Sequence, residues 1–164
     1  MEVLQMEKKT FKLYHGGGLM PWGVGCVVKN AKGFVWVSGC EGQDPTVPPP
    51  VGGREGFNPK VVEGAAAQTR LALEKMKARL EEMGTSLENM VHMVTYVKGP
   101  FPEGTGVVDS PNFRWDVIDD FFKEHCPNFA SDKNPPSWDL VGVASLAHKE
   151  MVFEVGCVAV LPDD

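Results

Sequence analysis

The chain of 164 residues is long enough for a domain with a buried core, and 43% of its residues are hydrophobic. Its formal net charge of −6 argues against nucleic-acid binding, because contacts with phosphates require a basic face. No apolar run approaches the roughly 20 residues that cross a bilayer, so we expect no membrane segment.

The N-terminal third of the chain favours β-structure. Residues 1–20 are predicted to be a short leader within a single domain of residues 1–164, and the apolar and aromatic residues at 11–14 favour an edge strand. Two apolar runs follow, Gly25–Lys29 and Phe34–Gly39, and the short glycine-containing connection between them predicts a β-hairpin. The next stretch, up to residue 60, is rich in proline and glycine, which excludes a helix and predicts an ordered loop at the rim of the domain.

A long helix is predicted at Val61–Gly84. Apolar residues recur there at spacings of three, four and seven, which gives one hydrophobic stripe: Val62, Ala66, Leu73, Met76 and Leu80. Gly84 stands where the glycine that ends a helix is expected. The next run, Met90–Val97, contains Val, Thr and Tyr, which favour a strand.

A second helix is predicted to begin at Ser110 and Pro111 and to end near His125. Serine is a preferred N-cap, and proline fits the first position of a helix. The inner face of this helix would carry Phe113, Val117, Ile118, Phe121 and Phe122.

The C-terminal stretch contains two further apolar runs, Leu140–Leu146 and Met151–Leu161. Four mostly polar residues separate them, which predicts a second hairpin. The second run carries one acid, Glu154, between apolar neighbours. An unpaired acid in a buried strand lowers the stability of the fold, so such an acid is usually paired or kept for a function. Glu154 is therefore the first candidate for a functional residue.

These elements follow the order β-β-α-β-α-β-β, with an additional strand possible in the leader. The order predicts an α+β protein, in which both helices cover one face of a mixed sheet. No third helix is predicted to cover the other face, so we expect the chain to associate with copies of itself.

The four cysteines are widely spaced and form no CxxC pair: Cys26, Cys40, Cys126 and Cys157. They are expected to be free thiols in a reducing compartment, which favours a cytoplasmic protein. The same spacing lacks the ligand pairs of a zinc site, so we expect no bound metal.

Five blocks of the sequence resemble, in the same order, the Rid/YjgF family of reactive-intermediate deaminases, also called the endoribonuclease L-PSP family. The similarity extends over about residues 20–162. The blocks are FVWVSG at Phe34–Gly39, the long segment Ala67–Val97, FFKEH at Phe121–His125, LVGVASL at Leu140–Leu146 and FEVGCVAV at Phe153–Val160.

The resemblance implies a chorismate-mutase-like α+β fold and a homotrimer with small-molecule sites in the clefts between subunits. Members of this family hydrolyse reactive enamines and imines, such as 2-aminoacrylate, to a 2-oxo acid and ammonia. A carboxylate activates the water and an arginine binds the carboxylate of the substrate. This chemistry requires no cofactor.

Only part of the family's site is present in this sequence. The acid of the last strand falls on Glu154, although a structural acid bonded to backbone is the alternative reading. The carboxylate-binding arginine falls on Trp138, within PSWD, and is therefore absent. The small or thiol residue two positions later falls on Leu140, and the tyrosine of the N-terminal loop falls near Gly25, with Trp22 close by.

Further departures concern the predicted substrate-binding residues. The family's asparagine falls on Trp115, beside Arg114, and its frequent glutamine falls on Cys40. Trp115 and Trp138 would make the cleft apolar and aromatic, which suits a substrate larger or more aromatic than 2-aminoacrylate. Arg114 could supply a displaced contact with an anion. The two tryptophans could instead serve the core or the trimer contacts, and Cys40 could be a wall residue or a nucleophile.

Two alternative functions are therefore compatible with the sequence. The first is a divergent Rid-type hydrolase of an imine, enamine or related C–N compound, with Glu154 handling water. The second is a non-catalytic trimer that binds a small molecule or a protein, which loss of the arginine favours. A nuclease, suggested by the family's older name, is disfavoured by the acidic charge and by the lack of a His/Lys constellation.

Overall fold

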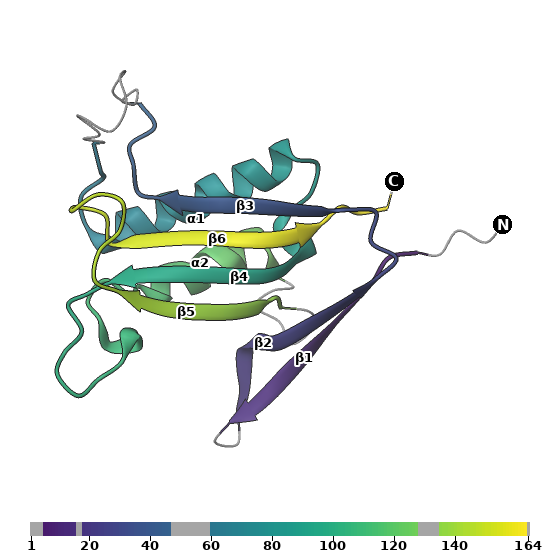
Figure 1. The fold of residues 1–164 in the computed structure, drawn as a ribbon, viewed down its shortest axis with the longest axis horizontal. Helices are drawn as coiled ribbons and strands as arrows, with labels where there is room; N and C mark the ends of the chain where they lie inside the picture. Colours follow the sequence, from purple (N-terminus) through teal and green to yellow (C-terminus); the bar gives the residue numbers. More distant parts are fainter. Residues whose placement is uncertain (1–4, 16–17, 47–59, 128–134, 164) are drawn as a thin grey trace.

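The computed structural model describes residues 5–15, 18–46, 60–127 and 135–163 (Figure 1). Residues 47–59, which form most of the predicted rim loop, lie outside the described residues. The elements in chain order are β1 (Glu7–His15), β2 (Gly18–Lys29), β3 (Phe34–Glu41), α1 (Ala65–Glu82), the 3-10 turn η1 (Leu87–Asn89), β4 (Met90–Lys98), the 3-10 turn η2 (Val107–Asp109), α2 (Trp115–His125), β5 (Ser137–Val143) and β6 (Phe153–Val160).

The six strands form one mixed sheet in the order β1-β2-β5-β4-β6-β3. Strand β4 is central, because it pairs parallel with β5 and antiparallel with β6. The predicted C-terminal hairpin is therefore wrong: β5 and β6 are separated by β4. The nine residues between the two strands are enough for the chain to cross over the end of β4.

The predicted N-terminal hairpin is also wrong. Strand β2 pairs with β1 and, through Gly23 and Ser137, with β5, whereas β3 pairs with β6 at the opposite edge of the sheet. The chain changes direction at Asn30, whose φ of 56° lies in the left-handed region that Asn tolerates. The true partner of β2 is the leader, so the predicted edge strand is confirmed as β1.

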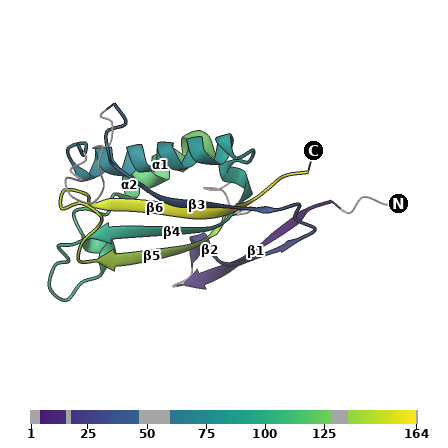
Figure 2. The same ribbon diagram turned by 45° about the horizontal axis from the view of Figure 1, so that its top comes forward.

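Both helices lie on one face of the sheet, as Figure 2 shows, so the predicted α+β architecture is confirmed. The core lies between this helix layer and the sheet. Helix α1 contributes Ala72, Leu73, Met76 and Leu80, which are fully buried because they share one side of the helix. Helix α2 buries Ile118, Phe121 and Phe122 against the same core.

Helix α1 starts four residues later than predicted. Val61 pairs with Gln43, and the Val62 N–H donates to the Gly42 carbonyl at 2.9 Å, so this segment is extended. The C-terminal end agrees with the prediction. The Gly84 N–H donates to Glu81 O at 3.1 Å and the Thr85 N–H donates to Leu80 O at 3.0 Å, with Gly84 at φ 80°.

Helix α2 also starts later than predicted, at Trp115 with Arg114 as its N-cap residue. The Ser110 hydroxyl caps a turn instead, because it accepts the Asn112 N–H at 3.3 Å. The Asn112 side chain donates to Lys98 O at 2.9 Å and to Gly99 O at 3.0 Å, which fixes this turn to the end of β4.

The opposite face of the sheet, which we call the open face, is covered by no helix of the described chain (Figure 2). As a result, strand β3 exposes large apolar side chains. Val35 and Val37 point to the core, whereas Phe34 and Trp36 alternate with them and are exposed on the open face. Trp36 is 68% exposed, and its ring centroid lies 5.8 Å from that of Phe34.

Replacing Gly84 by alanine should lower the free energy of unfolding by about 1 kcal/mol, because an L-residue strains at φ 80°. A Cβ at Gly84 would meet no atom within 4 Å, so the effect would come from the backbone alone. Urea unfolding measures it. Gly106→Ala is the matched control: it has equal space at an ordinary φ of −105° and should change stability little. Equal destabilisation by both variants would contradict this account.

Candidate functional site

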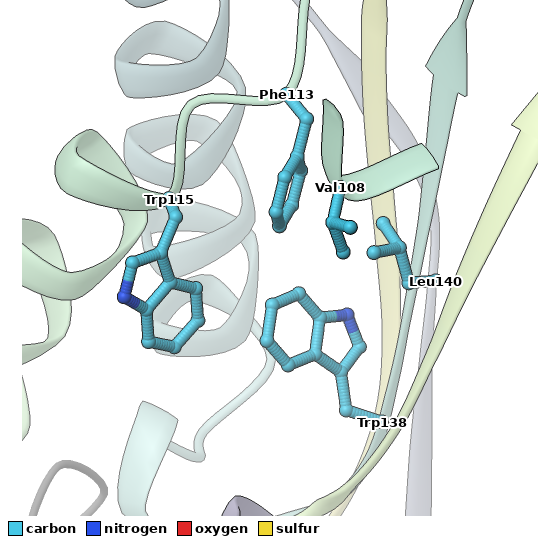
Figure 3. Close-up of a pocket in the computed structure, with 5 residues that line it drawn as sticks. All are labelled: Val108, Phe113, Trp115, Trp138 and Leu140. Atoms are coloured by element: carbon cyan, nitrogen blue, oxygen red, sulfur yellow. The ribbon is translucent and has the colours of Figure 1, made fainter. Parts of the chain in front are cut away.

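Two hollows of the described chain contain predicted site residues, and they lie on opposite faces of the sheet. The first, which we call the aromatic pocket, has a volume of about 450 Å³ (Figure 3) and is lined by Val108, Phe113, Trp115, Trp138 and Leu140. The second, which we call the open-face hollow, has a volume of about 260 Å³ and surrounds Glu154; its walls include Trp36, Ser38, Gly39, His92 and Tyr96.

The aromatic pocket is built where β5 meets the start of α2. Trp138 and Leu140 are alternate residues of β5, so both side chains lie on its helix side. Trp115 is the first residue of α2, and Phe113 precedes it in the turn fixed to β4. In Figure 3 the rings of Phe113 and Trp115 face Trp138 across the pocket.

A hydrogen bond from the indole N–H of Trp138 fixes the position of its ring. Its indole N–H donates to Thr95 Oγ1 at 3.0 Å, and Thr95 is completely buried. The Trp115 and Trp138 rings are stacked, with centroids 5.6 Å apart and an angle of 21° between their planes. Such aromatic pairs stabilise by about 0.5–1.5 kcal/mol beyond burial, so the pair forms a preorganised wall.

Arg114 does not line the aromatic pocket in the described chain. Its guanidinium binds the carboxylate of Asp116, with Nε donating to Oδ1 at 2.8 Å. The predicted displaced contact with an anion would therefore have to compete with this pair. The residues that do line the pocket are all apolar.

The carboxyl group of Glu154 lies across Gly39 on the open face. A Cβ at Gly39 would be 1.9 Å from Glu154 Oε1, so only glycine leaves room for this acid. Glu154 stands opposite Tyr96 of β4 and Glu41 of β3 in the sheet. Burial raises the pKa of the Glu154 carboxyl, and the neighbouring charge of Glu41 raises it further.

Cys40 lies on the helix side of β3, away from Glu154. It is 0% exposed, and its sulfur accepts a hydrogen bond from Arg79 Nη1 at 3.2 Å. Burial raises the pKa of the Cys40 thiol despite this nearby guanidinium, which disfavours a reactive thiolate. Arg79 also donates to Gly39 O at 3.3 Å, so it supports the backbone beneath Glu154.

A single chain does not bring the predicted site residues together. Trp138 pairs in register with Met93, a fully buried core residue, and so lies on the helix side. Glu154 pairs with Tyr96 and lines the open-face hollow. Trp115 and Trp138 therefore share one pocket, whereas Glu154 lies on the other side of the sheet.

Sequence reasoning missed Trp36, His92 and Tyr96 as neighbours of Glu154. The alternation of β3 contained a signal for Trp36, since it lies out of phase with the core residues Val35 and Val37. The proximity of His92 and Tyr96 had no such signal, because it depends on β4 pairing with β6.

No group of three or more His, Cys, Asp or Glu side chains within the described ranges is placed to hold a metal ion. Of the helices that the structure describes, none combines the length and the apolar character of a membrane span.

Comparison with known proteins agrees with this architecture. The family model for Endoribonuclease L-PSP matches residues 25–161 of the chain. A search of curated protein sequences found no match.

Solved structures provide the fold comparison. The Rid family protein YyfB from Yersinia pestis, of unknown function, is 17% identical with a TM-score of 0.63, covering 94% of this chain and 98% of that one. Escherichia coli TdcF with bound serine is 23% identical with a TM-score of 0.52, covering 93% and 98%. The YjgF gene product of Escherichia coli is 23% identical with a TM-score of 0.53, covering 85% and 87%. Since the family model covers most of the sequence and these folds agree with it, the chain belongs to the Rid/YjgF family, which is the endoribonuclease L-PSP family.

Proposed function

We propose that this protein is a divergent Rid-type hydrolase that acts on an imine, an enamine or a related C–N compound. The observation that carries the proposal is Glu154, a half-buried carboxyl group with a raised pKa in a hollow of suitable size for part of a substrate. A perturbed acid in a hollow is typical of a catalytic group.

The raised pKa gives Glu154 two useful states. The protonated carboxyl group can donate its proton to an imine nitrogen, and the resulting carboxylate can accept a proton from the attacking water. The water oxygen bonds to the carbon and gives a carbinolamine. The re-formed acid then protonates the amino nitrogen, the C–N bond breaks with release of ammonia, and the carboxylate takes up the hydroxyl proton. The product is a carbonyl compound, and the acid regains its proton.

The aromatic pocket supports a substrate with a flat apolar part. The resemblance places Trp138 at the position of the family's carboxylate-binding arginine, and the described residues that line the pocket around it are all apolar. An arginine–carboxylate hydrogen bond is worth about 1.5–3 kcal/mol, a contribution that an indole cannot supply. We therefore infer a substrate more aromatic than 2-aminoacrylate, bound without a cofactor.

The proposed active site requires more than one chain. Glu154 and the aromatic pocket lie on opposite faces of one sheet, so a second subunit must bring its open face to the pocket. The exposed apolar side chains of Trp36, Phe34 and Val141 support such an assembly, because a monomer would leave them in water. We propose a homotrimer with the substrate in the cleft between subunits.

The alternative function is a trimer that binds a small molecule without catalysis. The apolar lining of the aromatic pocket favours it, because this pocket holds no acid or base within the described chain. The two functions differ in their dependence on Glu154: catalysis requires its carboxyl group, whereas binding in the aromatic pocket does not.

Glu154→Gln should lower the rate of imine hydrolysis by about 10²–10⁴-fold, because a positioned acid or base contributes that factor. An amino-acid oxidase would generate small, acidic and aromatic imines, and semicarbazide would trap those that survive. We expect the wild type to deplete the aromatic imines most. Glu103→Gln, which alters an exposed loop acid, is the control and should retain activity. Equal depletion by wild type and Glu154→Gln would refute the role of Glu154.

The raised pKa of Glu154 also predicts a pH-dependent effect on stability. The folded state holds this proton more strongly than the unfolded state, so Glu154 costs stability as the pH rises above its unfolded pKa. Glu154→Gln removes this cost and should raise Tm more at pH 7.5 than at pH 4. Thermal unfolding at both pH values measures the difference. A gain that is the same at both pH values would contradict the raised pKa.

Trp36→Glu should convert the trimer into smaller species, because it places a charge on the open face. Sedimentation velocity at micromolar concentration measures the assembly state. Met83→Glu changes an exposed residue beside the C-terminus of α1, on the helix layer, and should leave the trimer intact. A wild-type protein that sediments as a stable monomer would exclude the proposed cleft between subunits.

A further inference from the structure

The hydrogen bonds of β5 show which of its backbone groups point toward β4 and which point away from it. The Pro136 carbonyl accepts the Gly23 N–H at 2.9 Å and so points toward β2, whereas the Val143 carbonyl accepts the Gly99 N–H at 3.1 Å on the β4 side. Backbone groups of successive strand residues alternate between the two edges. The N–H and C=O groups of Leu140 and Gly142 therefore point away from β4.

Among the described residues, no strand lies beside these outward groups. Strand β2 pairs with β5 only at Gly23 and Ser137, and Figure 1 shows the β1–β2 ribbon diverging from the rest of β5. In the part of the chain that the structure describes, no backbone bond reaches the outer edge at Leu140 or Gly142. An unpaired edge of this kind is a template for another amide.

The free edge borders the aromatic pocket. Leu140 contributes its backbone to the edge and its side chain to the pocket, next to Trp138. In a sheet, a residue placed directly opposite another projects its side chain on the same face. A ligand amide paired with Leu140 would thus direct the substituent on its neighbouring carbon into the aromatic pocket.

We propose that this site binds a neutral amide whose adjacent carbon carries an aromatic group. The amide pairs with the backbone of Leu140 as a strand residue would, and the aromatic group enters the aromatic pocket beside Trp138. As a statement about the substrate, this proposal rests on the proposed function; as a statement about binding, it stands without it.

Charge and size favour this ligand class over the two nearest alternatives. A carboxylate would find no cation among the described residues that line the pocket, and Arg114 is bound to Asp116. A protein partner would need a longer edge than Leu140 and Gly142 provide. A pocket of about 450 Å³ is typical of small-molecule sites.

N-acetyl-L-phenylalaninamide and N-acetyl-L-phenylalanine form a matched pair of probes, because the second differs by a terminal carboxylate. We expect calorimetric titration to show at least about tenfold tighter binding of the amide. Amide NMR signals of Leu140 and Gly142 should shift with the amide probe, and those of Val141 and Val143 should shift less. Tighter binding of the acid, or unchanged Leu140 and Gly142 signals, would overturn the proposal.

Two variants separate this inference from the proposed function. Trp138→Ala should weaken binding of the amide about tenfold or more, and Met83→Ala, on the exposed end of α1, should not. Glu154→Gln should bind the amide like the wild type, so loss of hydrolysis and loss of binding are distinguished. Slow exchange of the Leu140 amide proton in the unliganded protein would show the edge already covered by another subunit, and would overturn the proposal.

Discussion

The position of β4 between β5 and β6 is the constraint on which the rest of the structure depends. Because β4 pairs with both strands, the residues of β5 and β6 are placed by β4 rather than by each other. This registry sets Tyr96 opposite Glu154 and Met93 opposite Trp138. Because of this register, Glu154 lies on the open face and Trp138 lies on the helix side.

The open face carries an unfavourable feature that points to function. Glu154 is partly desolvated beside Glu41, and no cation relieves it among the groups that shift its pKa. Gly39 leaves space for the carboxyl group, and Arg79 holds the Gly39 carbonyl from the other side. A chain that needed only stability could place an apolar residue there, so the retained acid favours a chemical role.

The helix side carries the opposite kind of surface. Trp138, fixed by its bond to Thr95, stacks on Trp115 and forms a rigid aromatic wall with it. In the proposed function, Glu154 supplies the proton and this wall contacts the substrate. Selection among C–N substrates would then depend on shape and on uncharged hydrogen bonds rather than on an ion pair.

The sequence by itself determined the elements, their order and the helix-covered sheet, because periodicity is a local signal. It also singled out Glu154 as an isolated acid in an apolar strand. It did not determine strand pairing: both predicted hairpins, at residues 25–39 and 140–161, were wrong. Their error arose because the sequence does not show that β4 lies between β5 and β6, or that β1 rather than β3 pairs with β2. The helix starts were also displaced, because Asn112 and Gly42 bind distant backbone. Only the tertiary structure decided that Glu154 and Trp138 lie on opposite faces, since that follows from registry across β4, which depends on contacts remote in sequence.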